Sequence, residues 1–313
     1  MTKIATRVAY GQALAELGKE RSDIVALDAD LSCCTMSGTF GNENPDRFFN
    51  VGIAEANMVG MAAGLATLKK TVFVHSFAMF AAGRAYEQVR NSVCYPNLNV
   101  KVVGTHAGVS VGEDGPTHQC VEDIALMRAI PNMVVVQPCD AYETYFATKA
   151  IAEHEGPCYL RLGRQAVETV TERPDYRFEL GKGIVLRQGT DVTVIATGLM
   201  VQEALKAADM LAEEGISGRV VNMHTIKPLD SELVLQCARE TGAIVTAEEH
   251  NILGGLGAAV TETVCESYPV PVIRNGVQDM FGKSGAPYAL LERYHLRAKD
   301  LYDCCKKAIS LKW

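Results

Sequence analysis

The hydrophobic positions of this chain alternate between helical and strand spacing for almost its whole length. Residues 6–19 carry apolar side chains at helical spacing, and a short apolar run at 24–27 follows them as a predicted strand. Further strands are expected at 48–52, 71–74, 100–103, 133–136 and 159–162. The helices expected between them cover 55–68, 84–93, 119–129 and 141–153. This alternation is typical of a parallel sheet with helices on both faces.

A polar, proline-containing stretch at 165–183 interrupts the alternation, and the pattern restarts after it. We therefore expect a first α/β domain at 1–167, a linker at 168–185 and a smaller α/β domain at 186–313. Strands of the second domain are predicted at 191–196, 218–222, 243–247 and 271–274. Its helices are predicted at 201–213, at 231–240, from about 257, and in one or two closing segments.

Composition narrows the class of protein. The net charge of -7 argues against a nucleic-acid partner, because phosphate binding needs a basic face. The 10 cysteines are scattered without Cys-x-x-Cys spacing, so we expect no metal site in this chain and a reducing compartment. The N-terminal residues lack the apolar core of a signal peptide, and no apolar stretch approaches the ~20 residues of a membrane span. A cytoplasmic protein is the expectation.

Glu55 is the first residue of interest, because it stands where a predicted strand turns into a helix. A glutamate in a first helical turn is commonly there to complement the helix dipole. Here, however, its neighbours are apolar: Val51, Ile53, Ala54 and Met58. A buried carboxylate must be paired or must bind a hydrogen-bond donor, and a ring nitrogen of a bound heterocycle is one candidate donor.

The loop at 112–119 carries a second group of polar residues. Asp114 and His118 lie four positions apart between glycines, and His106 precedes them at the end of the 100–103 strand. Such composition is usually a simple turn, and the spacing matches no metal signature. Ligands nevertheless gather beyond the carboxyl ends of strands in open parallel sheets, where imidazoles bind oxygen substituents or move protons.

Other candidates have simpler explanations. Phe77 and Phe80 have the spacing of core aromatics. Arg7 and Arg164, each taken alone, read as surface or salt-bridging arginines. The glycine-rich run 254–257 could cradle an anion before a helix, but close helix packing explains it equally well.

These residues, in this order, resemble the transketolase family, specifically its pyrimidine-binding domain followed by its C-terminal domain. The resemblance extends from residues 4–7 through the Glu-Glu-His run at 248–250 and the glycines after it. The run Gly-Glu-Asp-Gly-Pro-Thr-His-Gln at 112–119 is highly specific, and Gly-Ile-Ala-Glu at 52–55 is shared more widely among thiamine diphosphate enzymes. The resemblance implies thiamine diphosphate as cofactor, with Glu55 contacting its aminopyrimidine ring nitrogen and favouring the imino tautomer that activates the thiazolium carbon.

The resemblance also implies roles for the other candidates. Phe77 and Phe80 would line the aminopyrimidine pocket, and Asp30 would lie near the cofactor. His106 and His118 would contact hydroxyl and carbonyl oxygens of the sugar, and Asp114 would bind the C2 hydroxyl of the acceptor. The terminal anion of the substrate would be held by three cationic or polar side chains, Arg7, His106 and Arg164.

The chain departs from the family pattern at three points. Cys34 stands where the family has a phosphate-contacting serine, and Gly83 stands where it has a third pocket aromatic. The Gly-Asp-Gly run and downstream asparagine that hold Mg²⁺ and the diphosphate are missing from the sequence. The resemblance therefore implies the C-terminal subunit of a split transketolase, whose separate N-terminal subunit supplies that site in an α2β2 assembly containing a homodimer contact.

Two-carbon ketol transfer between a ketose and an aldose, both expected as sugar phosphates, is the favoured activity. A subunit like deoxyxylulose-phosphate synthase or like the β chain of 2-oxoacid dehydrogenases is the alternative. A non-catalytic assembly subunit ranks below both, since it should have lost Glu55, Asp114 or His118.

Overall fold

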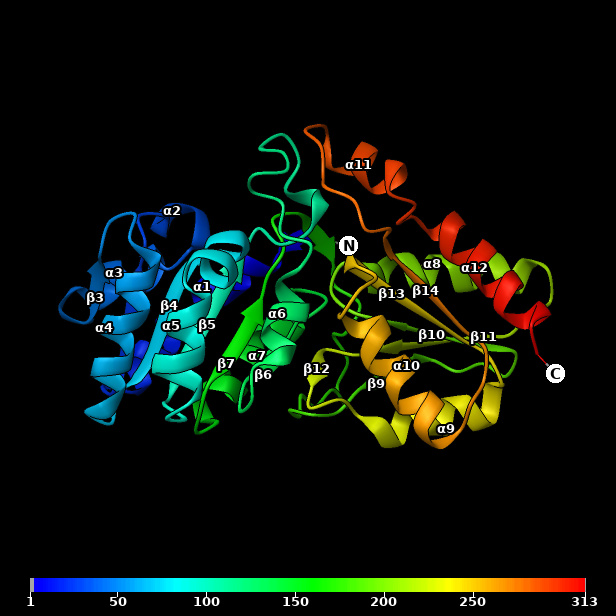
Figure 1. Cartoon of the computed structure of the whole chain (residues 1–313), viewed down its shortest axis with the longest axis horizontal. Coiled ribbons are helices and arrows are strands. Elements are labelled where there is room, and N and C mark those ends of the chain that lie inside the picture. Colours follow the sequence, from blue (N-terminus) through cyan, green and yellow to red (C-terminus); the bar gives the residue numbers. More distant parts are fainter. Residues whose placement is uncertain (1–2, 313) are drawn as a thin grey trace.

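The computed structural model describes residues 3–312 and shows two α/β halves lying side by side (Figure 1). The first half is built on a sheet with strand order β12-β6-β7-β5-β4-β2-β3. Its parallel strands are β2 (Ile24–Asp28), β3 (Phe48–Asn50), β4 (Thr71–Phe77), β5 (Val100–Thr105), β6 (Val134–Val136) and β7 (Cys158–Arg161). Because these strands run the same way, their carboxyl ends meet at one edge of the sheet.

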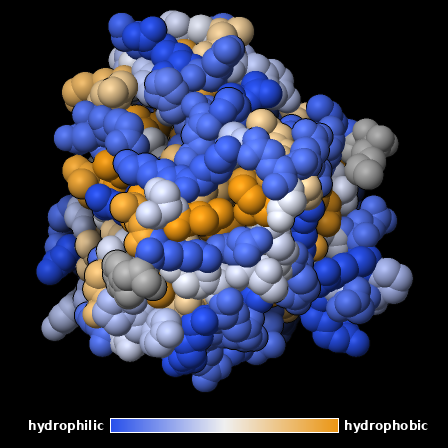
Figure 2. Space-filling view, turned by 90° about the vertical axis from the view of Figure 1, so that its right-hand side faces the viewer, coloured by the Kyte–Doolittle hydropathy of each residue, from blue (hydrophilic) through white to orange (hydrophobic). Residues whose placement is uncertain are grey.

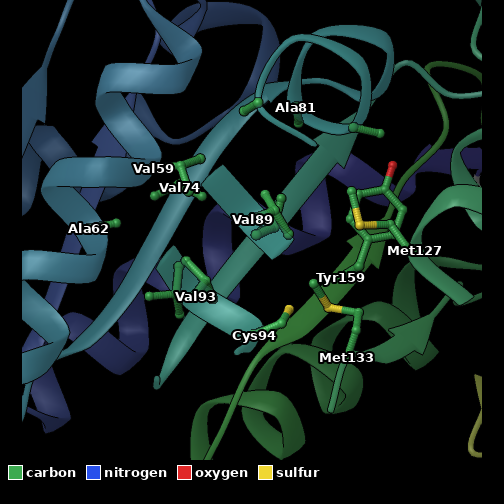
Figure 3. Packing of buried hydrophobic residues seen from close by; sticks show 14 of the residues in the cluster. Val59, Ala62, Val74, Ala81, Val89, Val93, Cys94, Met127, Met133 and Tyr159 are labelled. Carbon is green, nitrogen blue, oxygen red and sulfur yellow. The ribbon is translucent and has the colours of Figure 1, made fainter. Parts of the chain in front are cut away.

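Helices cover both faces of this sheet. On one face α1 (Thr6–Glu20) and α7 (Ala141–Glu153) pack on strand residues such as Ile24 and Phe73. On the other face α4 (Glu55–Thr67), α6 (Asp123–Ala129) and the helical segment 79–94 enclose a second apolar cluster. Figure 3 shows Val59 of α4 meeting Val74 of β4 within that cluster. The shorter turns are α2 (Ser32–Thr35), α3 (Gly38–Glu43), η1 (Pro45–Arg47) and η4 (Val109–Val111).

The second half repeats this arrangement around the strand order β14-β13-β10-β11-β9. Its strands are β9 (Ile184–Arg187), β10 (Val192–Ala196), β11 (Gly218–Asn222), β13 (Ile244–Asn251) and β14 (Val272–Val277). Side chains alternate along β10: Val194 packs with α8 and α12, and Ile195 packs on the opposite face with α9 and α10. The helices are α8 (Met200–Glu213), α9 (Ser231–Thr241), α10 (Leu256–Ser267), α11 (Pro287–Arg293) and α12 (Ala298–Ser310).

The predicted class, two successive parallel-sheet α/β units, is confirmed, with an antiparallel strand at one edge of each sheet. Edge strand β9 pairs antiparallel with β11, and β12 (Thr225–Lys227) leaves the second half to pair antiparallel with β6 of the first. A further antiparallel ribbon joins β1 (Lys3–Ala5) to β8 (Ala166–Glu168). The sequence pattern did not predict β1, β8, β9 or β12, which are short and pair antiparallel at sheet edges or in a two-stranded ribbon. The division at 167 and 186 stays a proposal.

The helix predicted at 84–93 differs most from the structure. In its place two π-helical turns, η2 (Met79–Arg84) and η3 (Val89–Cys94), flank the short helix α5 (Tyr86–Gln88). A π turn accommodates an extra residue within a helix and is frequent at functional sites. The segment therefore begins earlier than predicted and includes Phe80. The helix predicted at 119–129 begins only at Asp123, because residues 112–119 form a loop.

A buried carboxyl group, Glu143 of α7, joins the two halves. Its Oε1 accepts hydrogen bonds from the Tyr176 hydroxyl at 2.7 Å and from Asn222 Nδ2 of β11 at 2.7 Å. Its Oε2 accepts from the backbone N–H of Cys139 at 2.7 Å. Burial raises the pKa of Glu143 to about 7, although these three hydrogen bonds favour the ionised form. The junction therefore contains a group that titrates near neutral pH.

We expect Glu143→Gln to remove a pH dependence of stability. The folded chain keeps the Glu143 proton up to a pKa of about 7, whereas the ordinary value is 4.5. Protonated Glu143 therefore contributes fully to the free energy of unfolding below pH 4.5. This contribution is lost as pH rises through about 7, at up to about 1.4 kcal/mol per pH unit. Urea unfolding of both proteins at pH 5, 6 and 8 measures the slopes. Glu153→Gln, at the exposed end of α7, is the control; equal slopes for Glu143→Gln and the parent would contradict the prediction.

Among residues 3–312, no helix is long and apolar enough to cross a membrane. The same residues contain no cluster of three or more His, Cys, Asp or Glu side chains arranged to hold a metal ion. Hydrophilic residues cover most of the face at the second half's end of the molecule, with a hydrophobic strip across its middle (Figure 2).

Candidate functional site

The carboxyl edge of the first sheet brings most of the candidate residues together. Asp30 follows β2, Phe77 ends β4, His106 follows β5 and Arg164 follows β7. Asp30 and His106 both have left-handed backbone conformations, with φ of 65° and 56°. Residues other than glycine adopt this region rarely, and such positions cluster at functional sites. This edge is therefore the candidate site.

Glu55 begins α4 and is buried, with only 4% of its surface exposed. The apolar surroundings expected from the sequence are only partly present: Met58 is fully buried, but Ile53 points outward and is 75% exposed. The Glu55 carboxylate is also paired with an arginine. Arg84 Nη1 donates to Glu55 Oε1 at 3.1 Å.

Arg84 is a site residue that the sequence analysis missed. Its guanidinium lies 4.2 Å from the centre of the Phe80 ring, while it also bonds Glu55. Arg84 therefore holds the aromatic ring and the carboxylate next to each other. The π turn at 79–84 creates this geometry, and the regular helix predicted at 84–93 gave no sign of it.

Phe77, Phe80, His106 and His118 form one aromatic cluster. The Phe77 ring centre lies 6.0 Å from that of Phe80 and 4.1 Å from that of His106. The Phe80 ring meets His118 edge-on at 5.3 Å. At Gly83, where the resemblance implies a third aromatic, the Met79 side chain lies so close that a Cβ would be 2.6 Å from its Cε. The cluster offers flat apolar surface beside the Glu55 carboxylate.

The two histidines of the cluster differ in exposure. His106 is buried, and its Nδ1 lies 3.0 Å from the Thr105 hydroxyl. Burial, together with the charges of Arg7, Arg164 and His118, lowers the pKa of His106 to about 3. A neutral His106 imidazole is therefore suited to hydrogen bonding with an uncharged oxygen. His118 is only half-buried, and its Nδ1 lies 2.9 Å from the Thr117 hydroxyl.

Arg7 and Arg164 form the cationic end of the site. Arg7 Nη1 donates to the Cys34 carbonyl at 2.8 Å, so the backbone of Cys34 and not its thiol faces this arginine. Arg164 donates to the Val111 carbonyl, and its Nη1 lies 3.8 Å from Asp114 Oδ2. Both arginines act electrostatically on His106. An anionic group could therefore bind at this end.

The loop 112–119 is fastened at its C-terminal end by Gln119, a second residue that the sequence analysis did not single out. Gln119 Nε2 lies within hydrogen-bond distance of three carbonyls, those of Val109 at 3.1 Å, Gly112 at 3.2 Å and Lys283 at 2.9 Å. Gly112 and Gly115 have φ of 92° and 76°, a conformation that glycine adopts without strain. Asp114 lies at the exposed part of the loop between them.

A cleft of about 600 Å³ opens beside this cluster. Phe80, Arg84 and Thr117 of the first half line one side, and Asn251 and the segment 279–282 of the second half line the other. The site is thus accessible from the junction of the halves. A buried carboxyl group near flat aromatic rings is suited to bind a planar heterocycle that carries a hydrogen-bond donor.

Two sequence candidates do not join this cluster. Asp30 is exposed, and its Oδ1 accepts a hydrogen bond from Asn50 Nδ2 at 3.0 Å. In the glycine-rich run 254–257, the backbone N–H groups of Leu256 and Gly257 donate to the Glu248 carboxylate at 2.7 and 2.8 Å. The helix start at α10 therefore already holds an anion of the chain itself, and the packing explanation is the one supported.

Comparison with known proteins gives matches over both halves. The transketolase pyrimidine-binding domain matches residues 2–169, and the transketolase C-terminal domain matches residues 181–301. A Methanocaldococcus jannaschii protein named as a transketolase C-terminal section is 50% identical over 94% of this chain and 93% of its own length. A 6-deoxy-6-sulfo-D-fructose transketolase subunit of Clostridium sp. is 46% identical, covering 98% of this chain and 95% of the relative.

Structural comparison agrees with these matches. A solved split-gene transketolase, described as an inactive β4 tetramer, is 53% identical, covers 100% of both chains and has a TM-score of 0.91. Human transketolase is 41% identical over 93% of this chain, but the match spans only 47% of the human protein. The chain thus corresponds in extent to the first three proteins and to about half of the human enzyme.

Proposed function

This chain belongs to the transketolase family, and on that premise we propose that it is the C-terminal subunit of a split transketolase. The proposed reaction moves a two-carbon ketol unit from a ketose phosphate to an aldose phosphate. One observation carries the proposal: Arg84 links buried Glu55 to the Phe80 ring of an aromatic cluster that also contains Phe77 and His106. The cationic Arg7 and Arg164 lie close enough to this cluster to act on His106.

The cofactor end of the site consists of Glu55 and the two phenylalanines. Glu55 would accept a hydrogen bond from the aminopyrimidine ring, and Phe77 and Phe80 would pack against the faces of that ring. Arg84 holds the carboxylate in place through its bond to Oε1. Bound thiamine diphosphate would supply the nucleophilic carbon for the attack on the ketose. Asp30 is proposed to lie near the cofactor.

The substrate end consists of the two histidines, Asp114 and the two arginines. Neutral His106 and half-exposed His118 would donate hydrogen bonds to hydroxyl and carbonyl oxygens of the sugar. Asp114 would accept a hydrogen bond from the C2 hydroxyl of the acceptor. Arg7 and Arg164, with His106, would bind the terminal anion, since guanidinium groups match phosphate in geometry and charge.

A separate N-terminal subunit would complete the site. The chain lacks the Gly-Asp-Gly run of the diphosphate site, so that subunit would hold Mg²⁺ and the diphosphate. The half-length match to human transketolase and the inactivity stated for the β4 relative support a partner. We propose an α2β2 assembly with a homodimer contact between copies of this chain. Its cytoplasmic location stays a prediction.

The terminal anion has a second candidate. The Clostridium relative is named for a sulfonated sugar, and Cys34 presents its carbonyl to Arg7. A sulfonate carries less charge than a phosphate but the same three-oxygen face, so the arginines suit either anion. Parallel assays with phosphorylated and sulfonated ketoses decide between them.

The test of the proposed activity is ketol transfer by this chain mixed with its N-terminal subunit, thiamine diphosphate and Mg²⁺. Product aldose and ketose are measured with a panel of phosphorylated, sulfonated and neutral sugars. Turnover with at least one ketose–aldose pair is expected. A mixture that binds the cofactor and instead decarboxylates a 2-oxoacid would favour the alternative reaction.

We expect Arg164→Ala to weaken binding of the anionic acceptor. Loss of a hydrogen bond to a charged group costs about 1.5–3 kcal/mol, so KM for the acceptor should rise by about 10–100-fold while kcat changes little. Steady-state kinetics of the reconstituted enzyme measure both constants. Arg187→Ala, which removes an arginine paired with Asp209 in the second half, should leave KM unchanged. An unchanged KM in Arg164→Ala would remove this residue from the anion site.

A further inference from the structure

We propose that Glu249 of the second half is a positioning residue for the loop that carries Asp114 and His118. The proposal rests on the proposed function, and it gives the second half a part in substrate binding. Figure 1 shows the loop that precedes α6 rising next to α11, at the junction of the halves. Glu249 lies near the end of β13 and contacts Ser110 just before residues 112–119.

The Glu249 side chain contacts the backbone at the start of the loop directly. Its Oε1 accepts a hydrogen bond from the backbone N–H of Ser110 at 2.5 Å. A Cβ on Gly108 would overlap the Glu249 carboxyl group, and Gly108 has φ of 83°. Only glycine gives the loop this close approach to the carboxylate. The backbone at Gly108 and Ser110 therefore packs directly against the Glu249 side chain of the second half.

Arg161 fixes the position of Glu249 relative to the base of the loop. Its Nη2 donates to the Glu249 carbonyl at 3.1 Å and to the Cys120 carbonyl at 3.2 Å. Its Nε donates to Asp123 Oδ2 at 2.7 Å, and both charged groups are fully buried. At the base, Gly108 N–H donates to the Cys120 carbonyl at 2.8 Å. One hydrogen-bond network therefore connects β7, β13 and both ends of the loop.

A second contact holds the far side of the loop. Gln119 Nε2 donates to the Lys283 carbonyl at 2.9 Å, and a Cβ on Gly112 would lie 3.0 Å from Pro287 Cγ of α11. Asp114 and His118 lie between these two attachments. The second half therefore fixes both sides of a loop whose exposed part holds two proposed substrate ligands. A shift at Ser110 would be transmitted to Asp114, four residues away.

A carboxylate at this position needs an explanation, because an apolar side chain could fill the same buried space. Burial raises the pKa of Glu249, and the bond from Ser110 and the charge of Arg161 oppose that effect. A buried carboxylate costs free energy that only specific hydrogen bonds offset. The specific bond here is to the loop, which indicates that the position of the loop is what Glu249 determines.

The first test is hydrogen exchange on the isolated full-length chain. Glu249→Ala is expected to speed amide exchange at residues 109–112 by at least tenfold, and Glu249→Gln, whose amide oxygen still accepts from Ser110, should restore slow exchange. Glu248→Gln is the matched control, because Glu248 is equally buried but its carboxylate accepts from the α10 amides of Leu256 and Gly257 and lies 3.7 Å from His250 Nδ1, away from Ser110. It should leave the loop unchanged. Equal exchange in Glu249→Ala and the parent would overturn the proposal.

The second test uses the reconstituted enzyme. Glu249→Ala is expected to raise KM for the acceptor about tenfold, with cofactor affinity measured by calorimetry changed less than twofold. Gly108→Ala disrupts the same contact by a change in the loop, and it should raise KM for the acceptor by a similar factor. It replaces Glu249→Ala in this test if that variant does not fold. An unchanged KM in a folded Glu249→Ala variant, or an equal rise in Glu248→Gln, would contradict the proposal. Hydrogen exchange remains decisive even if ketol transfer itself is not found.

Discussion

Replacing Glu55 with glutamine is expected to lower ketol transfer by the reconstituted enzyme by about 10³-fold, within the 10²–10⁴ range of a positioned proton-transfer group. Glutamine keeps the size of the side chain and an oxygen for Arg84. It loses the charge that would share a proton with the aminopyrimidine nitrogen. Because Glu55 is buried beside Phe80 and Arg84, no water can easily take over that role. The expected loss is in kcat.

Steady-state kinetics and a thermal unfolding curve measure this prediction together. Glu87→Gln, which changes an exposed glutamate of α5 on the same helical segment, is the control and should retain full activity. Glu55→Gln should unfold at the same temperature as the parent within a few degrees. Activity within tenfold of the parent in a folded Glu55→Gln variant would exclude Glu55 as the proton-sharing residue.

Each subunit alone should have no measurable ketol transfer, and activity should appear when the two are mixed. This chain would supply Glu55, the aromatic rings and the proposed sugar ligands, but its sequence has no Gly-Asp-Gly run for Mg²⁺ and diphosphate. Without these anchors the cofactor would be held only through its aminopyrimidine end. Activity titrated against increasing N-terminal subunit should rise and then saturate at one partner per chain.

The controls for this prediction distinguish a failure of the two subunits to assemble from a loss of catalytic activity. A mixture containing the Glu55→Gln chain should assemble at the same stoichiometry, measured by sedimentation, and remain inactive. Turnover by this chain alone at the rate of the mixture would contradict a shared active site.

Much of the fold could be predicted from the sequence because its strands are buried and its helices amphipathic. The run at 24–27 and the helix at 141–153 lie where their periodicity indicates, as β2 and α7. The short strand β12 could not be predicted, since its three residues gain stability from pairing with β6 of the other half. Such a contact depends on how the two halves pack together, so the local hydrophobic pattern cannot predict it.

For the candidate site, too, the sequence pattern predicted the features that depend on chain order but not the pairs that depend on tertiary packing. The chain order of strands and loops was enough to bring Phe77, His106 and Arg164 to one edge, because parallel strands end together. The pairing of Arg84 with Glu55 depends on a π turn, and the pairing of Glu249 with Ser110 joins residues 139 positions apart. Ile53 was expected to enclose Glu55 and is exposed, because it lies in the bend that precedes α4 and not in the helix itself.

The measurement that tests the central claim most directly is calorimetric titration of thiamine diphosphate, with Mg²⁺, into this chain, into the N-terminal subunit and into their mixture. The account predicts one tight site per pair of subunits in the mixture, much weaker binding to either chain alone, and weaker binding again with Glu55→Gln. Equally tight, stoichiometric binding by this chain alone would contradict a cofactor site shared between two subunits.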